Sequence, residues 1–315
     1  MREPEIELLC SQLASYYVFP DTANEIAKVL RARLDEGAYS DVDDQDFAAR
    51  VTADLQSVNG DKHLRLLYSH DEVAETGQET AWDPVAYQKE AELAAFGITK
   101  VERLKGNVGL LDLRLLHDAG IATPAFVAAM NLIAHTDALI IDLRNNGGGD
   151  PNTVALICSY LFDERVHLND IYSRPDDTTE QYWTLSHVQG PKFGGKKPIY
   201  VLTSGRTFSG AEELSYNLQQ NERATLIGET TRGGAHPGDR YRVGPHLKSS
   251  IPNGRAINPI SGTNWEGVGV VPHIAVPADE AFDVAYKKAL EHVLTLGDEG
   301  PRRLIAEAAA EALIA

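Results

Sequence analysis

The segment Ala138-Leu139-Ile140-Ile141-Asp142-Leu143 constrains the fold of this chain more than any other. It is a near-continuous apolar run, which is typical of a strand buried on both faces of a sheet. It runs into a glycine-rich stretch, NNGGG at residues 145–149, and then into residues 153–162, which have helical character. This order of strand, glycine turn and helix predicts an α/β architecture.

The same plan recurs further along the chain. The apolar run at residues 198–202 leads into a turn that contains Ser204 and Ser209, and a helix is expected from about Ala211. A third unit is predicted to begin at residues 224–229. The remaining predicted elements are strands at 63–68 and 108–113 and a helix at 124–135, whereas the polar residues 163–197 are expected to be irregular.

Residues 1–60 differ in character from the rest. Apolar residues recur at helical spacing in three successive segments, which predicts a small helical N-terminal domain. Gly60 breaks this pattern. We therefore expect the α/β part to occupy residues 61–315, with a polar excursion around residues 71–97 that forms a lid or a pocket wall.

Charge and hydropathy exclude several classes of function. The formal net charge of −17 repels phosphate backbones, and no basic run offers a local exception, so a nucleic-acid partner is not expected. No apolar run approaches the length of a membrane span. The N-terminal residues lack the apolar core of a signal peptide, and the two cysteines, Cys10 and Cys158, lie among apolar neighbours as buried free thiols do. These features predict a cytoplasmic protein.

The turn at residues 204–210 offers a candidate nucleophile. A serine at a helix N-terminus, followed by a glycine, sits where backbone N–H groups and the positive end of the helix dipole converge, and Ser209-Gly210 fits. However, Glu212 stands three residues after Ser209, which is the spacing of a capping box. On this segment alone a helix cap is the commoner explanation. The NNGGG run is equally ambiguous, because it suits an oxyanion hole, an anion-binding nest or a tight turn.

A serine nucleophile needs a base, and histidine is suited because its pKa lies near neutrality. Of ten histidines, His63 opens a predicted strand just after Gly60-Asp61, and His236 lies in the glycine-rich loop GGAHPG. No metal site is predicted, because the chain has neither an HExxH motif nor a cysteine cluster. The absence of a P-loop or a GxGxxG fingerprint gives no reason to expect a nucleotide, and no cofactor is predicted.

Four stretches in this order, "ALIIDLRNNGGG", "VLTSGRTFSGAEE", "IGETTRGGAHPG" and "NWEGVGVVPHI", resemble a family of serine peptidases. That family includes the C-terminal processing proteases, the tricorn core and the repeat module of interphotoreceptor retinoid-binding protein. "YYVFPD" and "NGDKHLRL" extend the resemblance to the N-terminal part, and to the retinoid-binding-protein branch in particular. The resemblance implies a crotonase/ClpP-like ββα-spiral core behind a small helical domain.

The resemblance also implies roles for individual residues. The family's nucleophile falls on Ser209 rather than Ser204. The N–H of Gly210 would form half of the oxyanion hole, and an amide of Gly148 or Gly147 would form the other half.

Members of the family use one of two catalytic bases, a lysine or a histidine. The processing proteases use a lysine in the loop after the "GE" strand, but Gly234 stands there in this chain. The tricorn-like solution uses a histidine in an early "D-x-H" motif and a glutamate shortly before "G-V-x-P". The chain matches both, at His63 and Glu266. The resemblance therefore implies a Ser209–His63–Glu266 triad.

The chain also departs from the family's pattern. The stretch between His63 and Val108 is too short for the PDZ domain with which processing proteases grip substrate C-termini, so no PDZ domain is expected. The sequence as a whole predicts a serine hydrolase acting on a peptide or small acyl substrate. Two alternatives stay open: a non-catalytic binder of an apolar ligand such as a retinoid or lipid, and ester hydrolysis or cyclisation at the same site.

Overall fold

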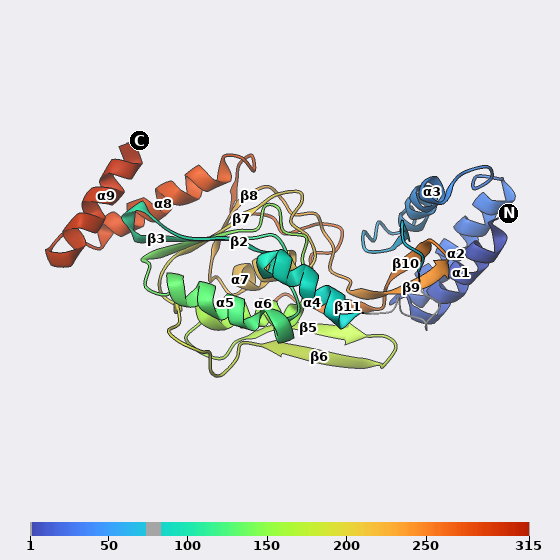
Figure 1. Cartoon of the computed structure of the whole chain (residues 1–315), viewed down its shortest axis with the longest axis horizontal. Coiled ribbons are helices and arrows are strands. Elements are labelled where there is room, and N and C mark those ends of the chain that lie inside the picture. The colour runs from blue at the N-terminus through green and yellow to red at the C-terminus, as the bar shows by residue number, and fades with distance from the viewer. Residues whose placement is uncertain (1, 74–82, 315) are drawn as a thin grey trace. The chain divides into compact units, whose positions relative to one another are not determined.

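A computed structural model describes residues 2–73 and 83–314 of the chain (Figure 1). The chain divides into two compact units. The first comprises Met1–Pro84, Asp170–Glu180 and Gly234–Ile257, and the second comprises Val85–Asn169, Gln181–Gly233 and Asn258–Ala315. The division predicted at residue 60 does not coincide with these units, because the first unit recruits two later segments of the chain.

Three helices open the first unit: α1 (Glu3–Tyr16), α2 (Pro20–Asp35) and α3 (Asp44–Gln56). α2 starts with a proline, whose missing N–H costs nothing at that position. α3 is capped by Asp43, whose carboxylate accepts the N–H of Asp46 at 2.8 Å. The buried apolar faces of the three helices pack together, as the helical spacing predicted. The helical bundle therefore lies in the N-terminal part of the chain, as predicted.

A small antiparallel sheet completes the core of the first unit. Its strands are β1 (Arg65–Tyr68), β10 (Leu247–Pro252) and β9 (Gly238–Gly244), in that order. β1 pairs with β10 through residues far apart in the sequence, such as Leu66 and Ser249. This pairing is the reason why the unit does not end near residue 60. In the same unit β11 (Gly254–Ile257) pairs antiparallel with β5 (His167–Ser173).

The second unit is built on a six-stranded sheet with the order β12-β8-β7-β4-β3-β2. The strands are β2 (Ile98–Leu104), β3 (Val108–Leu113), β4 (Ala138–Asp142), β7 (Ile199–Thr203), β8 (Thr225–Gly228) and β12 (Ile274–Ala275). All neighbours pair in parallel except β2 and β3, which are antiparallel. The structure thereby confirms the α/β class, with a mixed central sheet.

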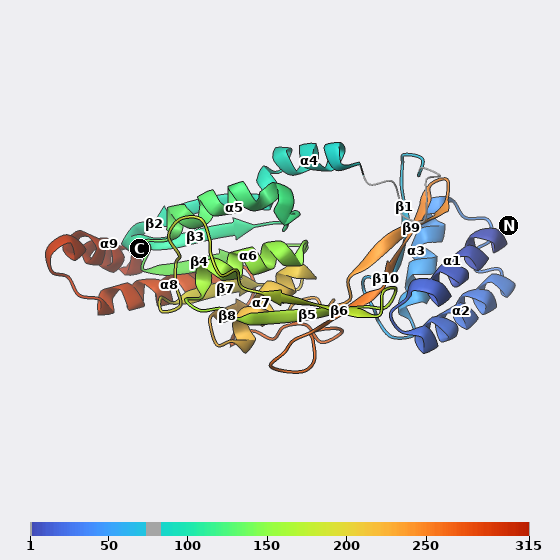
Figure 2. The ribbon, with the colours of Figure 1, turned by 90° about the horizontal axis from the view of Figure 1, so that it is seen from below.

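Helices cover both faces of this sheet (Figure 2). α5 (Ala119–Ile133) packs against β2 and β3, and α6 (Pro151–Leu161) and α7 (Gly210–Gln220) follow it in the same layer. α8 (Ala281–Thr295) covers the opposite face of β3, β4, β7 and β8, and α9 (Arg303–Ile314) packs on α8. The central strand β4 is buried at every position, as its unbroken apolar run predicted.

One region differs from the sequence-based expectation, and another lies partly outside the residues that the structure describes. Residues 163–197 contain β5 and β6 (Thr178–Trp183), although they were expected to be irregular. β6 exposes most of its side chains, so it carries no apolar signal. The excursion predicted around residues 71–97 includes α4 (Pro84–Leu93), while residues 74–82 lie outside the described part. Among the described residues no helix has the length and apolarity needed to cross a bilayer.

Candidate active site

The two glycine-bearing turns leave the sheet side by side. β4 and β7 are parallel neighbours, and Asp142 pairs with Leu202 near their carboxyl ends. The NNGGG run follows β4, and the turn with both serines follows β7. In open α/β sheets the carboxyl ends of parallel strands are where sites assemble. The sheet order therefore brings together the two motifs that the sequence singled out.

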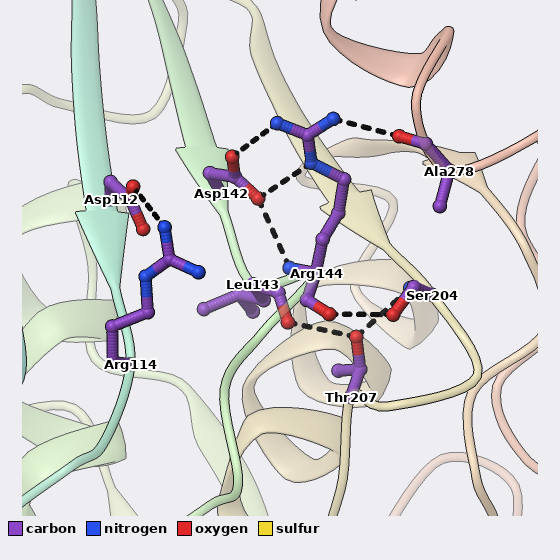
Figure 3. A network of polar contacts seen from close by, with 8 residues as sticks. All are labelled: Asp112, Arg114, Asp142, Leu143, Arg144, Ser204, Thr207 and Ala278. Atoms are coloured by element: carbon purple, nitrogen blue, oxygen red, sulfur yellow. Dashed lines mark hydrogen bonds and ion pairs between the residues drawn. The ribbon is translucent and has the colours of Figure 1, made fainter.

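Hydroxyl groups of one turn bind carbonyl groups of the other (Figure 3). Thr207 donates its hydroxyl to the carbonyl oxygen of Leu143 at 2.8 Å, and Ser204 donates to that of Arg144 at 2.5 Å. The Ser204 hydroxyl also accepts the N–H of Arg206 at 3.0 Å. Ser204 is 3% exposed, so its side chain joins the turns together and is not presented to a substrate.

An ion pair holds Arg144, which lies between β4 and the NNGGG run. Arg144 donates to both carboxylate oxygens of Asp142, at 2.9 and 2.6 Å, and to the carbonyl oxygen of Ala278 at 2.7 Å (Figure 3). A second pair, Arg114–Asp112 at 2.8 Å, lies on the neighbouring strand. Burial, and then the negative charge of Asp142, raise the pKa of Asp112 above its usual value. The two-point contact between Arg144 and Asp142 holds the residues that follow β4 in one conformation.

The backbone of Ser209 differs from that of an ordinary helix cap. Ser209 precedes α7 with φ 54° and ψ −123°, a left-handed conformation that is uncommon for a non-glycine residue. An ordinary N-cap has extended dihedral angles and needs no such conformation. Strained residues at a strand–turn–helix junction expose a nucleophile at the top of a sheet. The capping box predicted from the sequence is present, and within it the backbone N–H of Ser209 donates to Oε2 of Glu212 at 2.8 Å.

Gly148 lies directly against the turn at residues 204–210, which we call the nucleophile turn after the proposed role of Ser209. Its φ is +102°, and a β-carbon there would lie 2.7 Å from the Cβ of Ser209 and 2.8 Å from the amide nitrogen of Gly210. The N–H of Phe208 also donates to the carbonyl of Asn146 at 3.1 Å. The glycine run thus brings bare backbone to the serine, which is the approach that an oxyanion hole requires.

The N–H groups of Gly148 and Gly147 donate to different acceptors. That of Gly148 donates to Oδ1 of Asn146 at 2.8 Å, and that of Gly147 donates to the carbonyl of Arg114 at 3.1 Å. A third glycine, Gly149, also approaches the site, because a β-carbon on Gly210 would lie 2.9 Å from its nitrogen. The sequence assignment did not consider Gly149, although the third glycine of the run was the available signal. The oxyanion roles of Gly210, Gly148 and Gly147 stay predictions.

The predicted base, His63, belongs to the first unit. It is half-buried in the turn before β1, and its backbone N–H donates to Oδ1 of Asp61 at 3.0 Å. Oδ2 of the same carboxylate accepts the hydroxyl of Tyr17 at 3.0 Å and contacts Nδ1 of His236 at 2.9 Å. Asp61 therefore joins the turn of His63 to the imidazole of His236. Sequence reasoning named both histidines but missed the buried Asp61 that links them.

The predicted orienting residue, Glu266, belongs to the second unit, as Ser209 does. It is half-buried in the loop between β11 and β12, and its N–H donates to Oδ1 of Asn264 at 2.9 Å. A further turn bond joins the N–H of Gly269 to the carbonyl of Trp265 at 2.9 Å. The three residues of the predicted triad are therefore divided between the two units, and their joint role stays a prediction.

Two family profiles match the chain, and the first covers the segments that carry both turns. A profile described as peptidase family S41 matches residues 107–276, which is more than half of the chain. The chain belongs to peptidase family S41. A second profile, described as the N-terminal domain of peptidase S41 in eukaryotic IRBP, matches residues 5–96 of this S41 chain. The resemblance inferred from the sequence motifs is confirmed on both counts.

Similar proteins extend the comparison. A carboxyl-terminal-processing protease of Synechocystis sp. is 33% identical over 100 residues, covering 31% of this chain and 21% of that protein. A carboxy-terminal-processing protease of Bartonella bacilliformis is 27% identical over 189 residues, covering 55% and 40%. The S41 chain thus spans less than half the length of these relatives. The crystal structure of a putative peptidase from Parabacteroides merdae shares the fold, with a TM-score of 0.62, 16% identity and coverage of 95% and 98%.

Proposed function

We propose that this chain is a serine peptidase in which Ser209 attacks the carbonyl carbon of a peptide or a related acyl substrate. The observation that carries the proposal is the conformation of Ser209, which has φ 54° at the N-terminus of α7. A helix cap gains nothing from that conformation, whereas a nucleophile gains exposure and the proximity of N–H donors. Membership of family S41 supports the same reaction class.

The proposed roles form one acyl-transfer cycle. His63 takes the proton of Ser209 as its oxygen bonds to the carbonyl carbon, and then gives that proton to the leaving amine as the C–N bond breaks. Glu266 orients the imidazole of His63 and stabilises its cationic form. The N–H of Gly210 and an amide of the glycine run stabilise the oxyanion. Water then hydrolyses the acyl-enzyme by the same proton transfers.

One feature supports His63 and Glu266 over a serine–lysine dyad. Gly234 occupies the place where the dyad lysine is expected, so this loop supplies no lysine there.

Cleavage of a denatured, peptide-rich protein mixture, followed by mass spectrometry, tests the proposal. We expect new peptide ends with the wild type and a loss of at least about 10³-fold for Ser209→Ala and His63→Ala. Glu266→Gln should lower the rate less, because the base itself remains. Ser204→Ala is the matched control and should keep cleaving. Wild-type cleavage by Ser209→Ala would refute the nucleophile, and unimpaired His63→Ala would move the base to His236.

A second candidate function is the binding of an apolar ligand without catalysis. The observation in its favour is that residues 5–96 match the N-terminal domain found in eukaryotic IRBP, the branch that the sequence motifs resemble. Fluorescence titration with retinol and with a long-chain fatty acid, together with an assay on p-nitrophenyl esters, separates the candidates. Saturable binding without any Ser209-dependent hydrolysis would favour the binder, and Ser209-dependent hydrolysis of esters alone would favour non-peptide chemistry.

A further inference from the structure

Glu212 makes contacts that a capping box does not require. It lies three residues after Ser209 in the first turn of α7, and its side chain is 0% exposed. Its Oε2 accepts the N–H of Ser209 at 2.8 Å. Its Oε1 accepts both the hydroxyl of Thr231 at 2.5 Å and the N–H of Gly233 at 2.6 Å. The carboxylate therefore joins the nucleophile turn to the segment that follows β8.

Thr231 continues this connection toward the loop of Glu266. Its hydroxyl accepts the N–H of Val270 at 2.7 Å, and its own N–H donates to the carbonyl of Val270 at 3.2 Å. The N–H of Gly267, which follows Glu266 directly, donates to the carbonyl of Gly233 at 3.3 Å. Gly233 and Thr231, which both donate to Glu212, therefore bind the two ends of the loop segment 267–270.

Close glycine contacts keep the two segments in one register. Gly233 has φ +83°, and a β-carbon there would lie 3.0 Å from the nitrogen of Gly269. Gly269 has φ +73°, and a β-carbon there would lie 2.3 Å from the carbonyl oxygen of Thr231. Side chains at either position would push the backbones apart, so the hydrogen bonds to Glu212 and Thr231 act between closely fitted loops.

The burial of a carboxylate at this point needs a physical reason. An ionised group removed from water is costly unless donors replace its hydration, and Glu212 has three donors besides the N-terminal end of the α7 dipole. Hydrogen bonds to a charged acceptor are stronger and shorter than neutral ones. A cap alone would leave Oε1 in solvent. Here Oε1 is used to hold a second loop.

We propose that Glu212 is a positioning residue that fixes the backbone of Ser209 relative to the loop carrying Glu266. The inference rests on the proposed function, because it assigns Glu212 to the assembly of the Ser209–Glu266 half of the triad. Ser209 and Glu266 both belong to the second unit, so this connection lies within one compact unit. It acts through Thr231, whose hydroxyl donates to Glu212 and accepts the N–H of Val270 in the Glu266 loop.

The decisive variant is Glu212→Gln, which keeps the size of the side chain but replaces one acceptor oxygen with an NH₂ donor. That amide must lose either the Ser209 contact or the contacts to Thr231 and Gly233. Glu213→Gln is the matched control, since Glu213 is the next residue of α7, is buried at 5% exposure and is also a glutamate. Thr231→Val removes the hydroxyl, and Thr231→Ser restores it.

Two readouts are measured on each full-length variant: the rate of labelling by a fluorophosphonate, and hydrogen exchange of peptides covering residues 205–213 and 264–272. We expect Glu212→Gln to slow labelling about 10–100-fold, as a displacement near 1 Å does, and to lose exchange protection in both peptides. Thr231→Val should lose protection mainly in the second peptide, and Thr231→Ser should regain it. Glu213→Gln should match the wild type in both readouts at neutral pH.

The outcomes separate the inference from the function on which it rests. A wild type that is never labelled refutes the proposed function, and exchange alone then decides whether Glu212 couples the two loops. A labelled wild type whose Glu212→Gln variant reacts at the same rate, with unchanged exchange, overturns the inference and leaves the function standing. Loss of thermal stability without either change shows a purely structural role and also overturns it.

Discussion

A β-carbon added to Gly148 would lie 2.7 Å from the Cβ of Ser209, closer than non-bonded carbon atoms can approach. The two turns that follow β4 and β7 are therefore in contact at backbone level. This contact depends on a glycine whose φ of +102° also disfavours any other residue. It gives the oxyanion proposal a direct mutational test.

Gly148→Ala should therefore lower the labelling rate of the serine by at least about 10²-fold, comparable to the loss of an oxyanion donor. The physical cause is displacement of the glycine backbone from Ser209 and Gly210. Gly205→Ala is the control, since Gly205 lies in the same nucleophile turn and a β-carbon there would meet only Glu229, at 3.9 Å. Labelling kinetics measure both variants. Equal rates for Gly148→Ala and wild type would contradict the proposed placement.

Thr207→Val should destabilise the second unit by about 2–4 kcal/mol in urea denaturation. Thr207 is fully buried, and its hydroxyl donates to the carbonyl of Leu143 at 2.8 Å and accepts the N–H of Ser204 at 3.0 Å. Valine has the same shape but leaves both buried backbone groups without this partner. Thr207→Ser keeps the hydroxyl and should cost about 1 kcal/mol for the lost methyl group. A Thr207→Val variant as stable as Thr207→Ser would show that the hydroxyl contributes little.

Asp61→Asn should disturb the turn that carries His63. The carboxylate is 1% exposed and receives the N–H of His63, the hydroxyl of Tyr17 and Nδ1 of His236. An amide has only one acceptor oxygen, so at least one of these donors loses its acceptor, and a buried hydrogen-bonding group left unpaired costs about 1–3 kcal/mol. Tyr17→Phe removes one donor instead and should cost about 1 kcal/mol. Thermal unfolding of both variants checks the ranking, and equal losses would contradict it.

Glu213 makes the stability of the chain depend on pH. Burial raises its pKa from 4.5 to about 7, and the amides of Asn169 and Asn217 partly offset this rise. The folded state therefore holds a proton that the unfolded state has released between pH 4.5 and 7. Over that window stability falls as pH rises, because the unfolded state binds fewer protons. The difference between the two pKa values corresponds to about 3 kcal/mol.

Glu213→Gln should accordingly gain stability relative to the wild type on going from pH 5 to pH 8, by up to about 3 kcal/mol. Urea denaturation of both proteins at the two pH values provides the comparison, and the side-chain amide avoids the cost of burying a charge. A constant difference between the two proteins across this range would show that Glu213 does not titrate as described.

Local sequence patterns predicted much of the second unit. The strand expected at residues 108–113 is β3 (Val108–Leu113), and the apolar run from Ala138 became the buried strand β4. Both depend on apolar side chains that are contiguous in the sequence. β6 was missed because its side chains are mostly exposed. The later segments of the first unit could not be predicted, because the pairing of Leu66 with Ser249 is a non-local contact that leaves no local pattern.

Only part of the candidate site could be predicted from the sequence. Ser209 and the glycine run could be proposed from their motifs, but the positive φ of Ser209, which supports the nucleophile proposal, cannot be predicted from the local sequence. Glu266 followed from family resemblance alone, since nothing in its local sequence marks it. The link from Asp61 to His236 and the second contact of Glu212 depend on tertiary packing, so no sequence pattern contains them.

The most direct measurement is the identification of the residue that a fluorophosphonate modifies. The account predicts one adduct per chain by intact mass, located by peptide mapping at Ser209. The adduct should be absent from Ser209→Ala, present in Ser204→Ala and formed far more slowly in His63→Ala. A wild type that forms no adduct, or an adduct that persists in Ser209→Ala, would contradict the account.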